Sequence, residues 1–296
     1  MYLSDFNYFR PKSINEALVI LKKSPDAAAI AGGTDLLVEI KNGIRSHTDL
    51  VSLIDVKELK LLDEDENNIL IGAAITHNEL ISSPVINKYL PALSEAASKI
   101  GSDQIRNMGT VGGNICTAAA CCDTAPILMA MNASIEIAGT DQVKTIPLKD
   151  FFVFNKRTIL AKGELVTKII VPKAASGTGA YYEKFGLREA VSISVVSVAV
   201  MVKLKNNLIE NANVVIGAVA PTPKISSKCT ELLIGKSVSE FFEKSELIMM
   251  AGEAAVSDSI PIDDIRGGAQ YRRDVLKVVT QRAILKAIEN AKLNIQ

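Results

Sequence analysis

Polar residues that can cap a helix stand directly before apolar segments at two places in the first part of the chain. Ser13 precedes Glu16 by three positions, the spacing of a capping box, and predicts a helix that ends near Lys23. Thr76 and Glu79 repeat this spacing and predict a second short helix. A helical apolar face follows at residues 91–100, which start with a proline suited to the first turn.

Strand patterns alternate with these helices. Residues 26–43 (DAAAIAGGTDLLVEIKNG) predict a small apolar strand, a glycine turn and a helix that ends near Gly43. Residues 49–56 and 68–76 are β-branched apolar runs, and we expect two strands around an acidic surface turn at residues 63–66. A run at 164–172 predicts another strand that ends at a proline.

The second part of the chain begins after a small, glycine-containing segment at residues 173–180, which is the best candidate for a linker. Apolar runs at 192–204 and 208–220, joined by Asn206-Asn207, predict an antiparallel hairpin. Helical patterns follow at 237–256 and 269–291. Strands followed by helices predict an α+β domain whose sheet is covered on one face.

Length and charge narrow the class of protein. The chain has 296 residues, 48% of them apolar, which suits two domains with large cores. Its 33 basic and 33 acidic residues cancel, so a nucleic-acid or membrane-surface partner is not indicated. The N-terminal segment MYLSDFNYFRPKS has no secretory-signal pattern, and no apolar run reaches the roughly 20 residues of a membrane span. We expect a cytoplasmic protein.

The cysteines and histidines provide no convincing metal or nucleophile pattern. Four cysteines, at 116, 121, 122 and 229, do not match a disulfide framework or known metal-ligand spacings, and we interpret them as small reduced thiols. With only two histidines and no nucleophile elbow, a Ser–His or Cys–His pair is not expected. We therefore assign no catalytic residue and no metal site to this chain.

Two glycine loops are the main candidates for chemistry: AGGTD at 31–35 and GTVGGN at 109–114. Glycines let a backbone approach a ligand closely, and successive N–H groups can surround phosphate oxygens. The alternative for each loop is a turn that only needs glycine for its backbone angles. GTVGGN does not fit the dinucleotide fingerprint G-x-G-x-x-G, so a Rossmann domain is excluded.

Five motifs in order resemble one family over nearly the whole chain. AGGTDLL, IGAAITHNEL, QIRNMGTVGGNICTA with CCDTAP, YEKFGLREAVSISVVSVAV and DIRGGAQYRR resemble the FAD-binding subunits of molybdenum hydroxylases, such as xanthine, carbon monoxide and nicotinate dehydrogenases. The resemblance implies an α+β fold: a two-subdomain FAD-binding domain at residues 1–175, split near residue 55, then a C-terminal antiparallel sheet with a helical layer at 176–296.

The resemblance also implies a set of FAD contacts. Two loops would surround the pyrophosphate, Asp123 and Thr117 would bind hydroxyl groups of the cofactor, and Lys184 would face the pyrimidine end of the flavin. Alternatively, Asp123 caps the following helix and Lys184 is a solvated strand residue. The implied cofactor-binding residues are Ala29, Ile30, Ala31, Gly32, Gly33, Thr34, Asp35, Leu36, Ile100, Gly101, Thr110, Val111, Gly112, Gly113, Asn114, Thr117, Asp123, Leu165, Tyr182 and Lys184.

By the same resemblance, the chain is an electron-transfer subunit of a multi-subunit complex. Partner subunits would carry the molybdopterin-type cofactor and [2Fe-2S] clusters, and FAD on this chain would pass electrons to NAD(P)+. The complex would hydroxylate a heteroaromatic compound such as nicotinate or a purine. Two alternatives stay open: a self-contained flavin dehydrogenase or oxidase, and a flavin-free assembly module.

Overall fold

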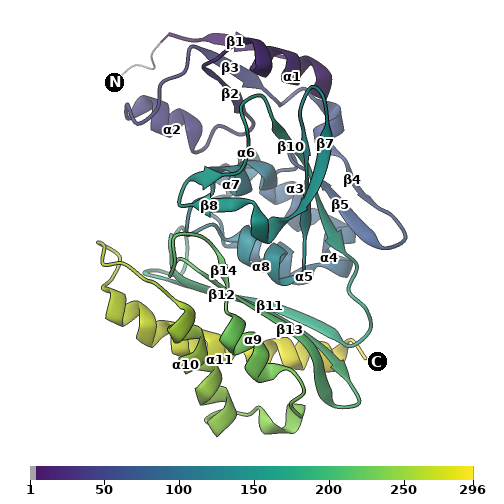
Figure 1. Cartoon of the computed structure of the whole chain (residues 1–296), viewed down its shortest axis with the longest axis vertical. Helices are drawn as coiled ribbons and strands as arrows, with labels where there is room; N and C mark the ends of the chain where they lie inside the picture. The colour runs from purple at the N-terminus through teal and green to yellow at the C-terminus, as the bar shows by residue number, and fades with distance from the viewer. Residues whose placement is uncertain (1–4, 296) are drawn as a thin grey trace.

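The computed structural model describes residues 5–295, so the first four residues of MYLSDFNYFRPKS lie outside it. Three β-sheets follow one another along the longest axis of the molecule (Figure 1). The N-terminal sheet lies at one end, a five-stranded sheet with a cluster of short helices lies in the middle, and the C-terminal sheet and its helices form the other end. The α+β architecture expected from the sequence is confirmed.

The N-terminal sheet is small and parallel. Ser13 caps the first helix by accepting a hydrogen bond from the N–H of Glu16, as the sequence predicts. The helices of this region are α1 (Ile14–Lys23) and α2 (Leu36–Lys41). Its strands, in sheet order, are β1 (Asn7–Phe9), β3 (Asp49–Ser52) and β2 (Ala27–Ile30).

The middle sheet is antiparallel, and five of the six short helices of this region contribute residues to its core. Its strands, in sheet order, are β4 (Leu62–Glu64), β5 (Asn68–Gly72), β10 (Leu165–Pro172), β6 (Ser134–Ala138) and β7 (Val143–Pro147). The helices are α3 (His77–Ser82), α4 (Pro84–Tyr89), α5 (Pro91–Ser98), α6 (Asp103–Met108), α7 (Val111–Thr117) and α8 (Thr124–Ala130). A separate two-stranded pair joins β8 (Phe152–Phe154) to β9 (Arg157–Thr158).

One expectation about these strands is wrong. The runs at 49–56 and 68–76 do not flank a simple turn, because β3 pairs with β1 and β2 while β5 pairs with β4 and β10. Part of the acidic segment expected as a turn is itself strand β4. The sequence pattern identifies strands well but does not specify which distant strand each one pairs with.

The C-terminal part contains a four-stranded antiparallel sheet in the order β11 (Thr178–Gly186), β12 (Ser194–Lys205), β13 (Leu208–Gly217) and β14 (Lys224–Ile225). The expected hairpin is confirmed: Asn206 and Asn207 join β12 to β13, and both have positive φ. The helices are α9 (Ser227–Leu233), α10 (Glu246–Asp258) and α11 (Ala269–Leu293). Helix α10 begins nine residues later than the pattern at 237–256 suggests, after a single turn of 3-10 helix at Val238–Glu240.

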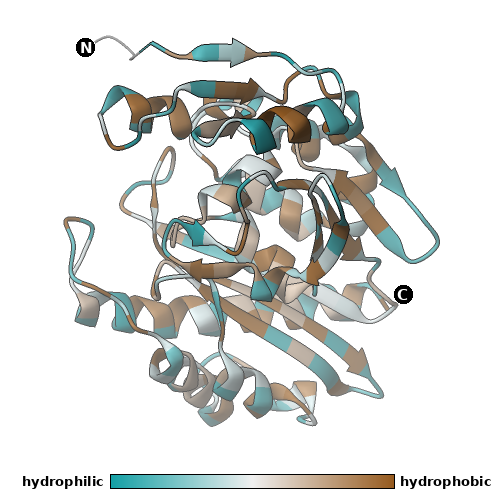
Figure 2. Cartoon of the chain, turned by 45° about the horizontal axis from the view of Figure 1, so that its top comes forward, coloured by the Kyte–Doolittle hydropathy of each residue, from teal (hydrophilic) through white to brown (hydrophobic). Residues whose placement is uncertain are grey.

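The C-terminal sheet is buried on both faces, so the expectation of a single covered face is wrong. Alternate residues of β12, such as Val198 and Val200, pack in a core with α10 and α11. The residues between them, Ala199 and Met201, belong to the core of the middle region and lie against α8. Apolar residues accordingly fill these strands (Figure 2). One face of the C-terminal sheet therefore packs against the middle region, and its other face packs against the C-terminal helices.

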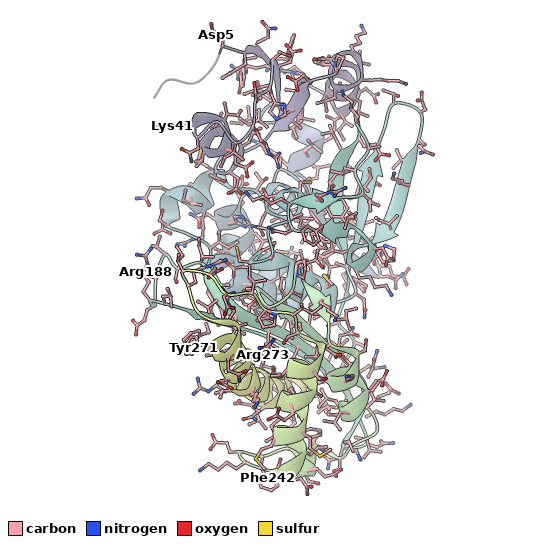
Figure 3. All side chains as sticks on the ribbon, turned by 60° about the vertical axis from the view of Figure 1, so that its left-hand side comes forward. Asp5, Lys41, Arg188, Phe242, Tyr271 and Arg273 are labelled. Carbon is pink, nitrogen blue, oxygen red and sulfur yellow. The ribbon has the colours of Figure 1, made fainter. Side chains whose placement is uncertain are left out.

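The start of α11 is attached to the sheet by two side chains. Tyr271 packs edge-on against Phe185 with ring centroids 6.2 Å apart, on the flank where Arg188 projects outward (Figure 3). Arg272 is 1% exposed, and its guanidinium donates to the carbonyl of Ala218 at 2.9 Å and to Asp264 at 2.6 Å. These contacts make Arg272 part of the packing between α11 and the sheet.

Candidate functional site

The two glycine loops, far apart in the sequence, touch each other in the structure. A Cβ atom on Gly32 would lie 1.8 Å from the carbonyl oxygen of Met108 and 3.0 Å from the backbone nitrogen of Gly109. Only glycine allows this close approach of two backbones. Gly33 adopts φ +69°, which also favours glycine. The N-terminal sheet and the helical cluster of the middle region meet at this contact.

The second loop is held tightly by its own domain. The N–H groups of Val111 and Gly112 donate to the carbonyls of Ile75 and Ala73, each at 2.9 Å. The N–H of Gly113 donates to the hydroxyl of Thr110 at 3.0 Å, which caps α7. Most backbone N–H groups of GTVGGN therefore donate to acceptors within the protein. This loop is held in place, but it offers few free donors to a ligand.

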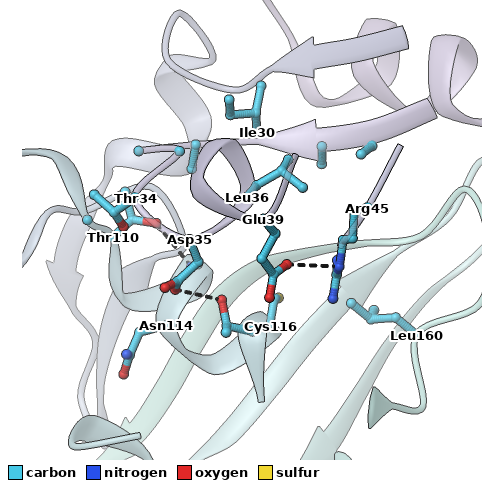
Figure 4. Close-up of a pocket in the computed structure, with 18 of the residues that line it drawn as sticks. Ile30, Thr34, Asp35, Leu36, Glu39, Arg45, Thr110, Asn114, Cys116 and Leu160 are labelled. Atoms are coloured by element: carbon cyan, nitrogen blue, oxygen red, sulfur yellow. Dashed lines mark hydrogen bonds and ion pairs between the residues drawn. The ribbon is translucent and has the colours of Figure 1, made fainter. Parts of the chain in front are cut away.

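The first loop has the opposite character. Among residues 5–295, no hydrogen-bond acceptor is found for the backbone N–H groups of four successive residues, Gly32, Gly33, Thr34 and Asp35. Successive unpaired N–H groups in a tight loop form a concave site for anionic oxygens. The loop lines a cavity of about 500 Å³, which Thr110, Gly113 and Asn114 of the second loop also line (Figure 4). The geometry fits a phosphate-containing ligand.

Hydrogen bonds and ion pairs between polar side chains connect the segments that form the cavity wall. The hydroxyl of Thr117 donates to Asp35 at 3.0 Å, which links α7 to the first glycine loop. Glu39 is 7% exposed and forms ion pairs with Arg45, at 2.9 Å, and with Lys156 (Figure 4). A buried carboxylate needs such partners, and here they join α2 to the loop that follows it and to the segment after β8. The resemblance implies that the Thr117 hydroxyl binds the cofactor; in the structure this hydroxyl donates to Asp35.

Both histidines of the chain line the same cavity. The Nδ1–H of His47 donates to the carbonyl of Asp26 at 3.1 Å. His77 is 2% exposed, and burial, with a smaller contribution from the charge of Arg106, lowers its pKa from 6.5 to about 4. The imidazole of His77 is thus neutral at physiological pH.

Asp123 is the centre of a second polar cluster, outside this cavity. It accepts hydrogen bonds from the hydroxyls of Tyr182 at 2.7 Å and Ser194 at 2.6 Å, and pairs with the Lys184 ammonium at 2.8 Å. Burial, followed by the charge of Asp123, raises the pKa of Tyr182 well above 10. The cluster joins α8 to β11 and to the start of β12.

This cluster decides two alternatives left open by the sequence. Asp123 occupies the N-cap position of α8 but makes no side-chain capping bond, so helix capping is wrong. The side chain of Lys184 is 7% exposed and donates to the carbonyl of Lys99 at 2.8 Å as well as to Asp123, so it is not a solvated strand residue. Lys184 is buried at the junction of the two halves of the chain, where it contacts Lys99 and Asp123 of the first half.

The structure thus divides the twenty predicted cofactor contacts into two groups. The residues that line the cavity are Ala29, Ile30, Ala31, Gly32, Gly33, Thr34, Asp35, Leu36, Ile100, Thr110, Gly113, Asn114 and Thr117. The others are not among its lining residues: Gly101, Val111, Gly112, Asp123, Leu165, Tyr182 and Lys184. Leu165 and Val111 are buried in apolar cores, and Gly112 packs with its Cα against Ala73.

Sequence reasoning missed several residues of the cavity. His47, His77, Glu39 and Arg45 all line it, yet no local pattern marks them as ligands. The sequence did contain one signal for Glu39: it is a single acid within an otherwise apolar run of α2, Leu36 to Ile40. Cys116, interpreted as a space-filling thiol, also lines the cavity, and burial raises its pKa to about 12.

Two features of the described residues bear on other classes of function. Across residues 5–295, no three His, Cys, Asp or Glu side chains are grouped so that they could hold a metal ion. Over the same residues, every helix is too short or too polar to cross a membrane.

Comparison with known proteins identifies the class to which this fold and cavity belong. Residues 4–174 match the family model described as the FAD binding domain in molybdopterin dehydrogenase. Residues 180–287 match the CO dehydrogenase flavoprotein C-terminal domain. The chain belongs to the FAD-binding medium subunits of the molybdenum hydroxylase family.

Individual relatives resemble the chain over its full length. The carbon monoxide dehydrogenase medium chain of Hydrogenophaga pseudoflava is 31% identical, with 94% of this chain and 96% of that one covered. The glyceraldehyde dehydrogenase medium chain of Sulfolobus acidocaldarius is 32% identical, with 96% and 98% covered. The solved carbon monoxide dehydrogenase of H. pseudoflava superposes with a TM-score of 0.93 at 31% identity, covering 98% of this chain and 99% of that one. The cofactor of the present chain is therefore FAD, and the family resemblance found in the sequence is confirmed.

Proposed function

We propose that the pyrophosphate of FAD binds to the first glycine loop, against the wall formed by the second. The observation that carries this proposal is the run of four backbone N–H groups at Gly32–Asp35 that have no acceptor among residues 5–295, in a loop that lines a cavity of about 500 Å³. Backbone donors bind phosphate oxygens without requiring a cation. Gly32 allows the two loops to close on each other at this point.

The buried cluster around Asp123 has a different place in this proposal. Asp123, Tyr182 and Lys184 lie at the junction between α8 and the C-terminal sheet, next to Lys99 and therefore beside Ile100 on the cavity wall. We assign Lys184 to the pyrimidine end of the flavin and Asp123 to hydroxyl groups of the cofactor. A cation near the pyrimidine ring stabilises negative charge on the reduced flavin.

The chain then serves as the electron-transfer subunit of a molybdenum hydroxylase complex. When bound, FAD accepts electrons singly from a [2Fe-2S] partner and delivers them in pairs as hydride to NAD(P)+. Substrate oxidation takes place on a partner subunit that holds the molybdopterin-type cofactor. We propose a heteroaromatic substrate, supported by relatives such as the nicotinate dehydrogenase FAD-subunit of Eubacterium barkeri, at 30% identity over 79% of this chain.

A direct test of the FAD site is reconstitution of the apo chain. The wild-type chain is expected to take up one FAD and to quench its fluorescence. Gly113→Val should prevent this, because even a Cβ at Gly113 would lie 2.9 Å from the Thr110 hydroxyl that caps α7. Gly139→Ala is the matched control, since its Cβ would make only ordinary contacts at 3.7 Å. Uptake by Gly113→Val equal to the control would contradict the site.

The acceptor and the alternatives need the purified complex. Steady-state assays with NAD+, NADP+ and a quinone, in the presence of nicotinate or xanthine, identify the acceptor and the substrate. Oxidation of a small substrate by the isolated chain would instead favour a self-contained flavin dehydrogenase or oxidase. A chain that never binds flavin, alone or in the complex, would be an assembly module.

A further inference from the structure

His77 is one of the polar groups of the cavity that the proposed function does not use. It is the first residue of α3 and lies where the middle region meets the first glycine loop. Its backbone N–H donates to the carbonyl of Gly109 at 3.0 Å, so the residue is attached to the second glycine loop. A buried imidazole that is held in this way has little freedom to turn.

The environment of the ring defines which nitrogen a ligand can reach. Nδ1 is sealed from solvent and has no hydrogen-bond partner among residues 5–295. A proton on Nδ1 would therefore be buried without an acceptor, which is costly. The neutral tautomer of His77 carries its proton on Nε2, and Nε2 is the nitrogen left for a ligand.

The orientation of the ring places this proton at the junction of the loops. Cδ2, the ring carbon bonded to Nε2, lies 3.3 Å from the point that a Cβ on Gly109 would occupy. The hydroxyl of Thr34 lies 3.5 Å from the same point. The edge of the ring that bears Nε2 thus faces the place where Gly32 and Thr34 of the first loop meet Gly109 of the second.

We propose that His77 is a ligand of the cofactor and that its Nε2–H donates a hydrogen bond to a phosphate oxygen of the FAD pyrophosphate. The proposal rests on the FAD site proposed above. It adds a side-chain donor, fixed on α3, to the backbone donors of the first loop.

Arg106 does not take over this task, although it is close enough to His77 to influence it. Its guanidinium donates to the carbonyls of Ile100, at 2.9 Å, and Gly101, at 3.3 Å, and pairs with Asp103. The charge of Arg106 is therefore committed to the wall of the cavity. Burial, with a smaller contribution from this charge, lowers the pKa of His77 and keeps the ring a neutral donor.

The test uses the full chain and three ligands: FAD, ADP and riboflavin. His77→Leu removes the donor while keeping an apolar side chain of similar size. Loss of one hydrogen bond to a charged group should raise the Kd for FAD and for ADP about 10- to 100-fold. Riboflavin lacks phosphate, so its Kd should be unchanged. His77→Gln retains an N–H donor and should restore most of the affinity for FAD.

A second measurement needs no variant of His77. The chain has only two histidines, so ¹⁵N-histidine labelling gives two sets of ring signals, and His47→Gln assigns them. At pH 7, His77 should show the neutral tautomer protonated on Nε2, and this proton should move downfield when ADP or FAD binds. A ring that is insensitive to ADP would overturn the inference.

The outcomes distinguish this inference from the proposed function. If wild-type chain binds FAD but His77→Leu binds FAD and ADP equally well, His77 is not a phosphate ligand and the FAD site still stands. Equal weakening of riboflavin and FAD would also overturn the phosphate assignment. If wild-type chain binds neither FAD nor ADP, the proposed function itself is wrong, and this inference with it.

Discussion

Replacing Gly32 with alanine would test the contact on which the whole cavity depends. The added methyl carbon would lie 1.8 Å from the oxygen and 2.5 Å from the carbon of the Met108 carbonyl. Ordinary van der Waals contact begins at 3.4 Å, so one backbone must retreat by about 1.6 Å. Neither neighbour is a flexible side chain that could move aside.

Such a displacement has two measurable effects. Overpacking of this kind costs about 1–3 kcal/mol of unfolding free energy. It also separates the unpaired N–H groups of the first loop from the second loop. Loss of two hydrogen bonds to phosphate, at about 1.5 kcal/mol or more each, raises the Kd for FAD at least about a hundredfold.

The assay is titration of apo chain with FAD, followed by quenching of flavin fluorescence, together with urea unfolding of the same samples. Gly139→Ala, a substitution in the β6–β7 turn, controls for the general effect of adding a methyl group at glycine. A Kd for Gly32→Ala within about threefold of wild type, with unchanged unfolding, would refute the contact between the loops.

Three further predictions concern Asp123, Asp264 and two of the cysteines. Asp123→Ala should lower the free energy of unfolding by about 3–5 kcal/mol because it leaves the Lys184 ammonium buried and unpaired; urea unfolding measures this, and the double variant with Lys184→Met should recover part of the loss. Hydrogen bonds from two arginines lower the pKa of Asp264 below its usual 3.8, so the stabilisation is complete above pH 3.8 and is lost as the pH falls further. The difference in unfolding free energy between wild type and Asp264→Asn should therefore shrink below pH 3.8, and a pH-independent difference would contradict this assignment. Burial raises the pKa of both Cys116 and Cys122 to about 12, so both thiols should alkylate slowly; because Cys116 lines the cavity and Cys122, at 3% exposed, does not, prolonged alkylation followed by mass spectrometry should show FAD protecting Cys116, while Cys122 reacts only after unfolding.

Local features of the fold were predictable from the sequence. The capping box at Thr76 is present as expected, and Ser13 caps its helix, although the Glu16 carboxylate accepts from the N–H of Lys12 instead of completing a box with Ser13. Such bonds form within four residues and depend little on tertiary structure. The hairpin at Asn206-Asn207 is equally local, since both asparagines adopt the positive φ that the turn requires. The division of the chain between residues 175 and 176 stays a prediction.

Non-local features were not predictable in this way. Asp123 meets Tyr182 and Ser194 across 59 and 71 residues of sequence. The resemblance named Asp123 and Tyr182 separately, but no pattern indicates that one binds the other. Strand β12 did carry an unused signal: a nearly continuous apolar run is typical of a strand buried on both faces, which is what the structure has.

Helix α8 has a consequence for how the chain is made in the cell. All seven of its residues are buried, and they pack against β11, β12 and β13, which are synthesised afterwards. Strand β13 ends at Gly217, 87 residues beyond the last residue of the helix, Ala130. At about 5–20 residues per second, the ribosome needs roughly 4 to 17 seconds to deliver this cover. During that interval the nascent flavin domain exposes an apolar surface, and a chaperone that shields it should increase the yield of native protein.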